Sequence, residues 1–275
     1  MLNIVVCIKQ VPMVTELPWD EKTGTLRRDL AAGMMNPACK HAVEAALRIK
    51  ADGGASITVV TMGPPAAEEV LREALAMGAD RGLLVCDRLL AGSDTYATSF
   101  VLGRAIAKEV PGYDLILCGA YTSDSETAQV GPQLAEELDL PAVAYAERLE
   151  ISGRVLRVRR LVDKFRETLE MEFPALVTVS MEQYKPRYAS FAGINRAFAE
   201  ADILSVNLKR LDITPAELAA HGSRTRVRRV FIRKTQKENV LITGAAANAA
   251  AEFLDKYQRK ISAVIGKSIE AKKQT

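Results

Sequence analysis

The chain of 275 residues is 48% hydrophobic and 26% charged, a composition typical of a globular protein with a full hydrophobic core. Its 37 basic and 34 acidic residues leave a net charge of +3, which is too small to favour nucleic acid or a membrane surface as a partner. No apolar run reaches the length of a membrane span, and the N-terminal run is too short for the core of a signal peptide, so we expect a cytoplasmic protein without membrane insertion.

Five short apolar runs in the first half of the chain are predicted to be β-strands, at 3–9, 56–62, 82–86, 114–119 and 142–145. They are apolar almost without interruption, as in parallel strands that are covered on both faces. Helical patterns lie between them, at 36–54, 63–80 and 92–110. In the first of these, Asn36 is expected at the N-cap with Pro37 after it. This alternation predicts an α/β fold with a doubly wound, mostly parallel sheet.

The pattern changes after residue 145. Residues 146–172 alternate between apolar and polar and contain a Ser-Gly turn at 152–153, which predicts an antiparallel extension of the sheet. A return strand is expected at 175–180.

The last third of the chain is less regular. A basic, extended segment at 224–234 precedes a helical pattern at 244–267, which together predict an irregular C-terminal arm. Arginines interleaved with apolar residues suit an arm that lies on another protein, whereas the low net charge disfavours nucleic acid. We therefore expect 1–190 to form the nucleotide-binding α/β domain and 191–275 to carry a docking loop and an arm that packs on a partner subunit.

Residue types that carry covalent or metal chemistry are sparse. The four cysteines lie far apart without a CxxC pair, so they are expected to be small buried hydrophobes rather than a disulfide frame or a metal site. The two histidines, His41 and His221, accompany no nucleophile elbow, and there is neither a GxGxxG nor a P-loop motif. The sequence therefore predicts no catalytic residue and no metal ligand.

The most informative segment is the polar run at 120–131, directly after the strand at 114–119. In an open α/β sheet, ligands bind outside the carboxyl ends of the strands. Pro132 cannot occupy a helix interior, so the next helix must begin near 128–131. Free N–H groups of that first turn would suit phosphate oxygens or ribose, and so would the hydroxyls of Ser125 and Thr127. The carboxylates of Asp124 and Glu126 suit ribose hydroxyls, or complement the helix dipole.

Taken singly, Ser125 and Thr127 are better interpreted as ordinary capping residues on a surface loop. Similar polar segments follow the other predicted strands, at 36–37, at 61–65 and at 91–95, where Asp94 and Thr95 stand. Because the carboxyl ends of parallel strands meet at one edge of the sheet, the whole set favours a nucleotide cleft.

Several of these segments together resemble the β subunit of electron transfer flavoproteins. The resemblance covers about the first two-thirds of the chain in order, and its most specific motifs are "ALAMGADRG" at 74–82 and "TAQVGPQLAE" at 127–136. Past residue 200 a weaker match around "HGSRTRVRRVF" is similar to the layout of members that bifurcate electrons.

The resemblance implies a non-covalent heterodimer. The larger α subunit of this family holds the FAD that exchanges electrons with flavin dehydrogenases. The β subunit holds AMP in ordinary members, or a second FAD that meets NADH in bifurcating members. The family's cofactor-binding positions fall here on Cys7, Asn36, Pro37, Ala38, Cys39, Met62, Thr122, Ser123, Asp124, Ser125, Glu126, Thr127, Ala128, Gln129 and Val130.

Phe191 stands at the family's apolar anchor for docking dehydrogenases. It is followed by "NRAFAEAD" at 195–202 instead of a lysine-rich stretch, so we expect an electron partner other than an ordinary acyl-CoA dehydrogenase.

Three hypotheses follow. The leading one is an electron carrier subunit with FAD in this chain that takes electrons from NADH. The second is a structural β subunit whose bound AMP supports folding and assembly. The third is an ATP-using enzyme or nucleotide sensor of related fold, which would turn over ATP or assemble without an α partner.

Overall fold

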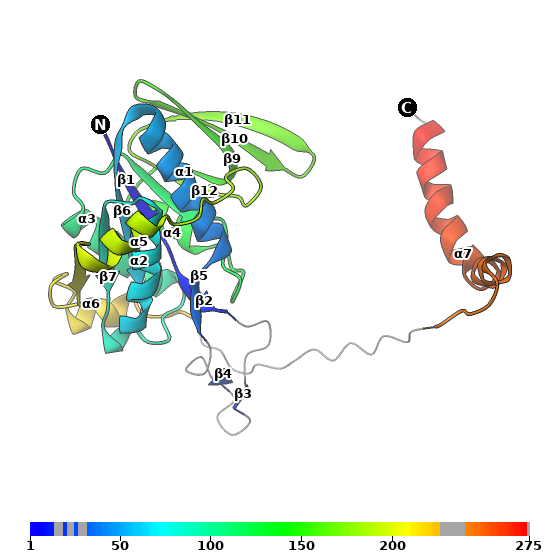
Figure 1. Cartoon of the computed structure of the whole chain (residues 1–275), viewed down its shortest axis with the longest axis horizontal. Helices are drawn as coiled ribbons and strands as arrows, with labels where there is room; N and C mark the ends of the chain where they lie inside the picture. Colours follow the sequence, from blue (N-terminus) through cyan, green and yellow to red (C-terminus); the bar gives the residue numbers. More distant parts are fainter. Residues whose placement is uncertain (14–18, 21–24, 27–31, 226–239, 274–275) are drawn as a thin grey trace. The chain divides into compact units, whose positions relative to one another are not determined.

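The computed structural model describes residues 1–13, 19–20, 25–26, 32–225 and 240–273, and the chain divides into two compact units, Met1–Val230 and Phe231–Thr275. The first unit contains a nine-stranded sheet with the strand order β11-β10-β9-β12-β8-β1-β6-β7-β13 (Figure 1). The strands are β1 (Leu2–Cys7), β6 (Ala55–Met62), β7 (Arg81–Val85), β8 (Leu115–Gly119), β9 (Ala142–Ser152), β10 (Val155–Val162), β11 (Phe165–Glu172), β12 (Ala175–Val179) and β13 (Ile203–Val206).

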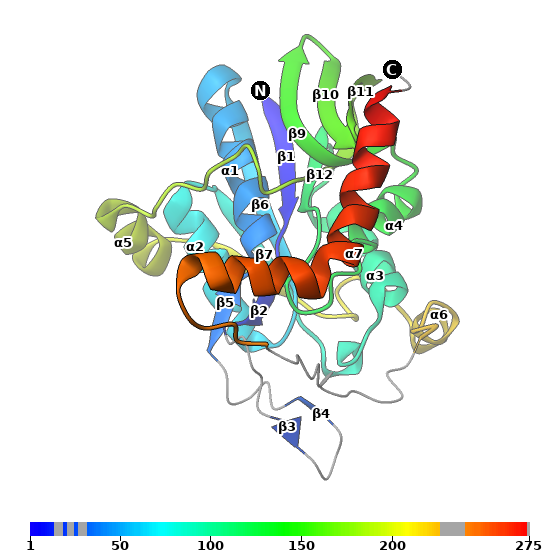
Figure 2. The same cartoon turned by 90° about the vertical axis from the view of Figure 1, so that its right-hand side faces the viewer.

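Helices cover both faces of this sheet, as Figure 2 shows for α1 and α2 on one side and α3 and α4 on the other. The helices of the first unit are α1 (Pro37–Gly53), α2 (Glu68–Met77), α3 (Thr95–Glu109), α4 (Val130–Glu137), α5 (Phe191–Ala199) and α6 (Pro215–Ala220), with short 3-10 turns η2 (Pro65–Ala67) and η3 (Arg88–Leu90). Two short ladders, β2 (Gln10–Pro12) with β5 (Gly33–Met35) and β3 (Trp19–Asp20) with β4 (Thr25–Leu26), lie outside the main sheet.

Burial on both faces explains why the central strands are apolar without interruption. In β1, Ile4 and Val6 join the core formed with α1 and α2, while Val5 and Cys7 join the core formed with α3 and α4. The predicted doubly wound, mostly parallel sheet with an antiparallel extension is therefore confirmed.

The antiparallel extension begins at a bend inside β9. Residues 142–146 of β9 pair in parallel with β12, whereas residues from 146 onward pair antiparallel with β10. Where the parallel pairing gives way to the antiparallel pairing, Tyr145 has φ of 61°, which is an uncommon value for a bulky residue. This backbone angle redirects the strand. Phe173, just before β12, donates its N–H to the Arg154 carbonyl, so the tip of the β9–β10 hairpin lies back at the amino end of β12.

Two elements depart from the expectations. The helix expected from residue 63 begins as α2 at Glu68, because Pro64 and Pro65 first form the η2 turn. β13, which was not predicted, adds a parallel strand beside β7 and so keeps residues beyond 190 in the main sheet.

Much of the predicted basic segment, at 226–234, lies outside the described residues. The second unit carries α7 (Ala246–Lys273), which matches the terminal helix expected at 244–267. Within the described part of the chain, no helix combines the length and apolarity needed to cross a membrane. The packing of 191–275 on a partner subunit stays a prediction.

Candidate functional site

The polar loop at 120–129 runs from the carboxyl end of β8 to the first residue of α4. α4 begins at Val130, as Pro132 requires. β1, which lies beside β8 in the sheet, ends at Cys7, and the register pairs Cys7 with Cys118. The loop therefore stands at the edge of the sheet where ligands of open α/β proteins bind.

Asn36 ties this loop to the start of α1. Its side chain is 1% exposed, and its amide nitrogen donates to the Tyr121 carbonyl at 2.8 Å while its amide oxygen accepts from the Ser123 N–H at 3.0 Å. Asn36 occupies the N-cap position with Pro37 after it, as expected, although its side chain makes no capping hydrogen bond to α1. The amide is used instead to fix the first half of the loop.

Gly119 allows β8 to end in close contact with the first turn of α1. A Cβ added at Gly119 would lie 2.7 Å from the carbonyl carbon of Ala38 and 2.7 Å from the nitrogen of Cys39. Only glycine fits a backbone approach of this kind. This contact brings Ala38 and Cys39, two of the predicted site residues, beside the start of the loop.

Three of the four free cysteines are buried at this edge of the sheet. A hydrogen bond with the Cys7 thiol, together with burial, raises the pKa of Cys118 well above its usual value. Burial likewise raises the pKa of Cys39. Cys39 and Cys118 are therefore neutral thiols, unlike the thiolates of nucleophilic sites. Within the described ranges, no cluster of three histidine, cysteine or acidic side chains has the arrangement of a metal site.

The second half of the loop is held by an ion pair and by its own backbone turns. The ammonium of Lys9 lies 2.9 Å from each carboxylate oxygen of Asp124. The hydroxyls of Thr122 and Ser125 are 2.8 Å apart. Glu126 and Ala128 adopt left-handed backbone angles, with φ of 48° and 55°. Such alternations turn successive N–H groups toward one side of a loop.

α4 begins without a side-chain cap. Gln129 stands at its N-cap position but makes no capping hydrogen bond; the Gln129 amide oxygen instead accepts from the Thr95 hydroxyl at 2.9 Å. An uncapped helix start at a ligand-binding edge leaves N–H groups for the oxygens of an external anion. This property fits the phosphate of an adenine nucleotide.

Asp94, one of the predicted cofactor contacts, is occupied by the protein's own backbone. Its carboxylate caps α3 through the Ala97 N–H at 3.0 Å and also accepts from the N–H groups of Arg224 at 2.7 Å and Thr225 at 2.9 Å. Burial alone would raise the pKa of Asp94, but these donors and the Thr225 hydroxyl hold it below its usual value. Asp94 thus anchors the point at which the chain leaves for the C-terminal arm, and its contact with a cofactor stays a prediction.

Of the other predicted site residues, Met62 and Thr127 lie at the carboxyl edge of the sheet, whereas Phe191 lies on a separate surface. Met62 ends β6, and the exposed Thr127 lies in the loop itself. Phe191 belongs to a separate surface at the start of α5, where its side chain is 94% exposed. Lys9 and Gly119 were missed by the sequence analysis, although both stand at or just past the carboxyl ends of central strands, where a ligand-binding role could have been suspected.

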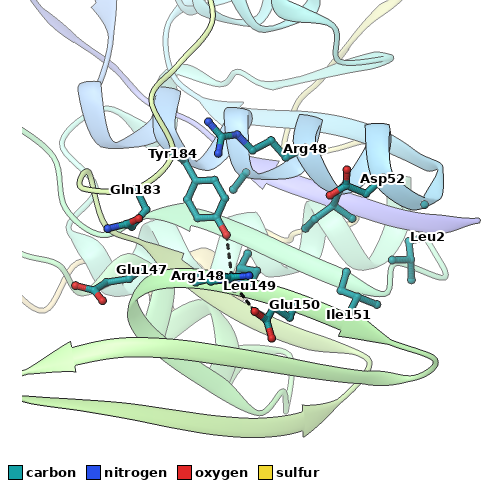
Figure 3. A pocket seen from close by; sticks show the side chains of 13 residues that line it. Leu2, Arg48, Asp52, Glu147, Arg148, Leu149, Glu150, Ile151, Gln183 and Tyr184 are labelled. Atoms are coloured by element: carbon teal, nitrogen blue, oxygen red, sulfur yellow. Dashed lines mark hydrogen bonds and ion pairs between the residues drawn. The ribbon is translucent and has the colours of Figure 1, made fainter.

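A separate cavity of about 640 Å³ lies between the second half of α1 and β9 (Figure 3). Some of its polar groups bind each other. The Tyr184 hydroxyl accepts from the Leu149 N–H at 2.8 Å, and Arg148 pairs with Glu150 at 2.7 Å. Leu2, at the amino end of β1, also lines it, so this cavity is distinct from the loop at the carboxyl edge.

Comparisons with known proteins show the family to which the chain belongs. A family model described as the electron transfer flavoprotein domain matches residues 23–208. The chain is 40% identical over 259 residues to the electron transfer flavoprotein subunit beta of Thermoanaerobacterium thermosaccharolyticum, which covers 94% of this chain and 99% of that protein.

Two further relatives are subunits of reductase systems. Over 254 residues the chain is 40% identical to the caffeyl-CoA reductase-Etf complex subunit CarD of Acetobacterium woodii, covering 92% of this chain and 96% of that one. Over 265 residues it is 36% identical to the acryloyl-CoA reductase electron transfer subunit gamma of Anaerotignum propionicum, covering 94% and 99%. The chain belongs to the electron transfer flavoprotein family, as a β subunit.

Proposed function

We propose that this β subunit pairs with an FAD-carrying α subunit and shuttles electrons between flavin dehydrogenases and acceptors, with a second FAD, bound at the 120–129 loop, taking electrons from NADH. The uncapped start of α4 behind a loop fixed by buried contacts carries the proposal. A flavin supplies the electron chemistry when bound, and the residues of this chain hold and orient it.

The protein residues have separate tasks in this proposal. Asn36 and Lys9 fix the loop, the first turn of α4 binds phosphate oxygens, and the exposed hydroxyls of Ser125 and Thr127 contact ribose or phosphate. Cys7 and Met62, which end β1 and β6, would lie beneath the bound nucleotide. No bond-making group is required of the protein.

The names of two relatives favour FAD over AMP as the nucleotide bound by this chain. Both are named for CoA-ester reductase systems. The resemblance of the 127–136 motif and of the tail layout to bifurcating members points the same way. A flavin enzyme acting on CoA esters is therefore the proposed electron partner. AMP remains the alternative occupant, because a phosphate-binding loop serves either nucleotide.

Thr127→Trp tests the site. Thr127 is exposed, so the indole should fill nucleotide space without disturbing the core. We expect the purified heterodimer to lose one nucleotide and to keep the FAD of the α subunit, as measured by absorbance and chromatography of the released cofactors.

The matched control is Thr168→Trp, on the exposed face of β11, which should retain both nucleotides. Retention of both nucleotides by Thr127→Trp would contradict the assignment of the site.

A further inference from the structure

Lys9 joins three elements of the candidate site. It follows the carboxyl end of β1, its carbonyl accepts the N–H of Asn36 at 2.9 Å, and its ammonium binds both carboxylate oxygens of Asp124. Asn36 holds the loop through Tyr121 and Ser123, directly before Asp124. Lys9 therefore supports the loop in two ways: its backbone carbonyl binds Asn36, which holds the first half of the loop, and its side chain binds Asp124.

We propose that Lys9 is a positioning residue of the nucleotide site, which neutralises Asp124 and holds the loop in its binding conformation rather than contacting phosphate itself. The inference rests on the proposed nucleotide site.

The different exposures of the two side chains support this role. The Asp124 side chain is 7% exposed, whereas that of Lys9 is 42% exposed. A carboxylate so far removed from water needs a positive partner, and a negative charge left there would repel an approaching phosphate. The ammonium is held between two carboxylate oxygens, so its charge is already matched within the protein.

Asp124 also leads into the turns that precede α4. The Ser125 hydroxyl donates to Asp124 at 3.3 Å and lies 2.8 Å from the Thr122 hydroxyl. The left-handed residues Glu126 and Ala128 follow directly. A shift of Asp124 would therefore displace the N–H groups that the nucleotide is expected to use.

Two variants distinguish a positioning role of Lys9 from a direct contact between Lys9 and phosphate. Lys9→Met removes the ammonium and keeps a similar chain length, while the Lys9→Met/Asp124→Asn double variant removes both charges. We expect Lys9→Met to weaken nucleotide binding in the heterodimer by at least about tenfold, since an ion pair to a buried carboxylate is lost. The double variant should recover to within about threefold of the wild type, because its amide needs no cation.

The measurements are the nucleotide content of the purified heterodimer and the affinity for added FAD and AMP. Lys40→Met is the control, because the Lys40 side chain is exposed to a similar degree as that of Lys9 but pairs with Glu73, a carboxylate far more exposed than Asp124. It should leave both quantities unchanged. Equal losses in Lys9→Met and in the double variant would overturn the proposal in favour of direct phosphate contact, and full retention by Lys9→Met would overturn it outright.

Amide hydrogen exchange of Ser123 gives a readout that does not depend on a nucleotide. Exchange should be faster in Lys9→Met than in the wild type and restored in the double variant. If wild-type heterodimer binds no nucleotide, the proposed function fails, while unchanged exchange at Ser123 in Lys9→Met would contradict the positioning role by itself.

Discussion

At the scale of single residues, the site depends on two positions that allow no substitution of similar chemistry. Asn36 is buried and uses a donor and an acceptor of one amide on two loop residues, so neither a carboxylate nor a hydroxyl can replace it. Gly119 stands where any Cβ would meet backbone atoms of α1. The site is thus specified by the fit of backbone segments more than by a set of reactive groups.

Gly119→Ala should destabilise the protein by about 1–3 kcal/mol and reduce its nucleotide content, because backbone must move to admit the new methyl group. Urea denaturation of the heterodimer would measure the loss. Gly53→Ala, where an added Cβ meets nothing within 4 Å, is the matched control and should have little effect. Equal stability of the two variants would contradict the close contact between β8 and α1.

Asn36→Ala leaves the Ser123 N–H and the Tyr121 carbonyl without their buried partner. We expect a loss of about 1–3 kcal/mol in the free energy of unfolding, the usual cost of such groups. The loss should be accompanied by weaker binding of FAD or AMP, measured by titration calorimetry. Undiminished affinity would show that the loop keeps its conformation without this amide.

At the scale of elements, Asp94 connects α3 to the start of the C-terminal arm. Asp94→Ala should accelerate amide hydrogen exchange at Arg224 and Thr225, whose N–H groups it binds, and remove about 1 kcal/mol of helix capping. Asp87→Ala, which removes an acceptor for Leu89 and Leu208 elsewhere, should not change exchange at 224 and 225.

The pKa of Asp94 adds a pH dependence to the same contact. Because the folded-state pKa lies below the usual value, the stabilisation is complete at neutral pH and is lost as the pH falls from the usual aspartate pKa of about 4 through the lowered one. Wild type and Asp94→Ala should therefore converge in stability at acidic pH, and a constant difference in stability across that range would contradict this assignment.

α5 presents an exposed apolar face, which is the kind of surface that the docking role predicted for Phe191 would need. Phe191, Ile194 and Phe198 recur at helical spacing and are 94%, 42% and 66% exposed. Gly193 faces the other way, since a Cβ there would lie 2.2 Å from the Ala76 carbonyl oxygen of α2.

Phe191→Ala should slow electron transfer to a flavin dehydrogenase by about tenfold or more, as loss of an exposed aromatic anchor does at protein interfaces. Nucleotide content should not change. Phe165→Ala, which removes a 75% exposed phenyl ring from β11, is the control. Equal rates for the two variants would remove α5 from the docking surface.

At the scale of the whole molecule, the sequence predicted the parallel sheet because its strands are buried on both faces and are therefore apolar without interruption. It did not predict the bend of β9 at Tyr145, because a positive φ at tyrosine has no local signal. The polar loop could be located from its place after β8 and before Pro132. The contacts that Lys9 and Asn36 make with this loop could not be predicted, since they join residues that are 115 and 87 positions apart in the sequence.

The nucleotide content of the native heterodimer, released by denaturation and identified by chromatography, tests the central claim most directly. Two FAD per heterodimer, one of them lost in Thr127→Trp, is the predicted result. One FAD with one AMP would contradict a flavin in this chain and make it the structural subunit of an ordinary electron carrier.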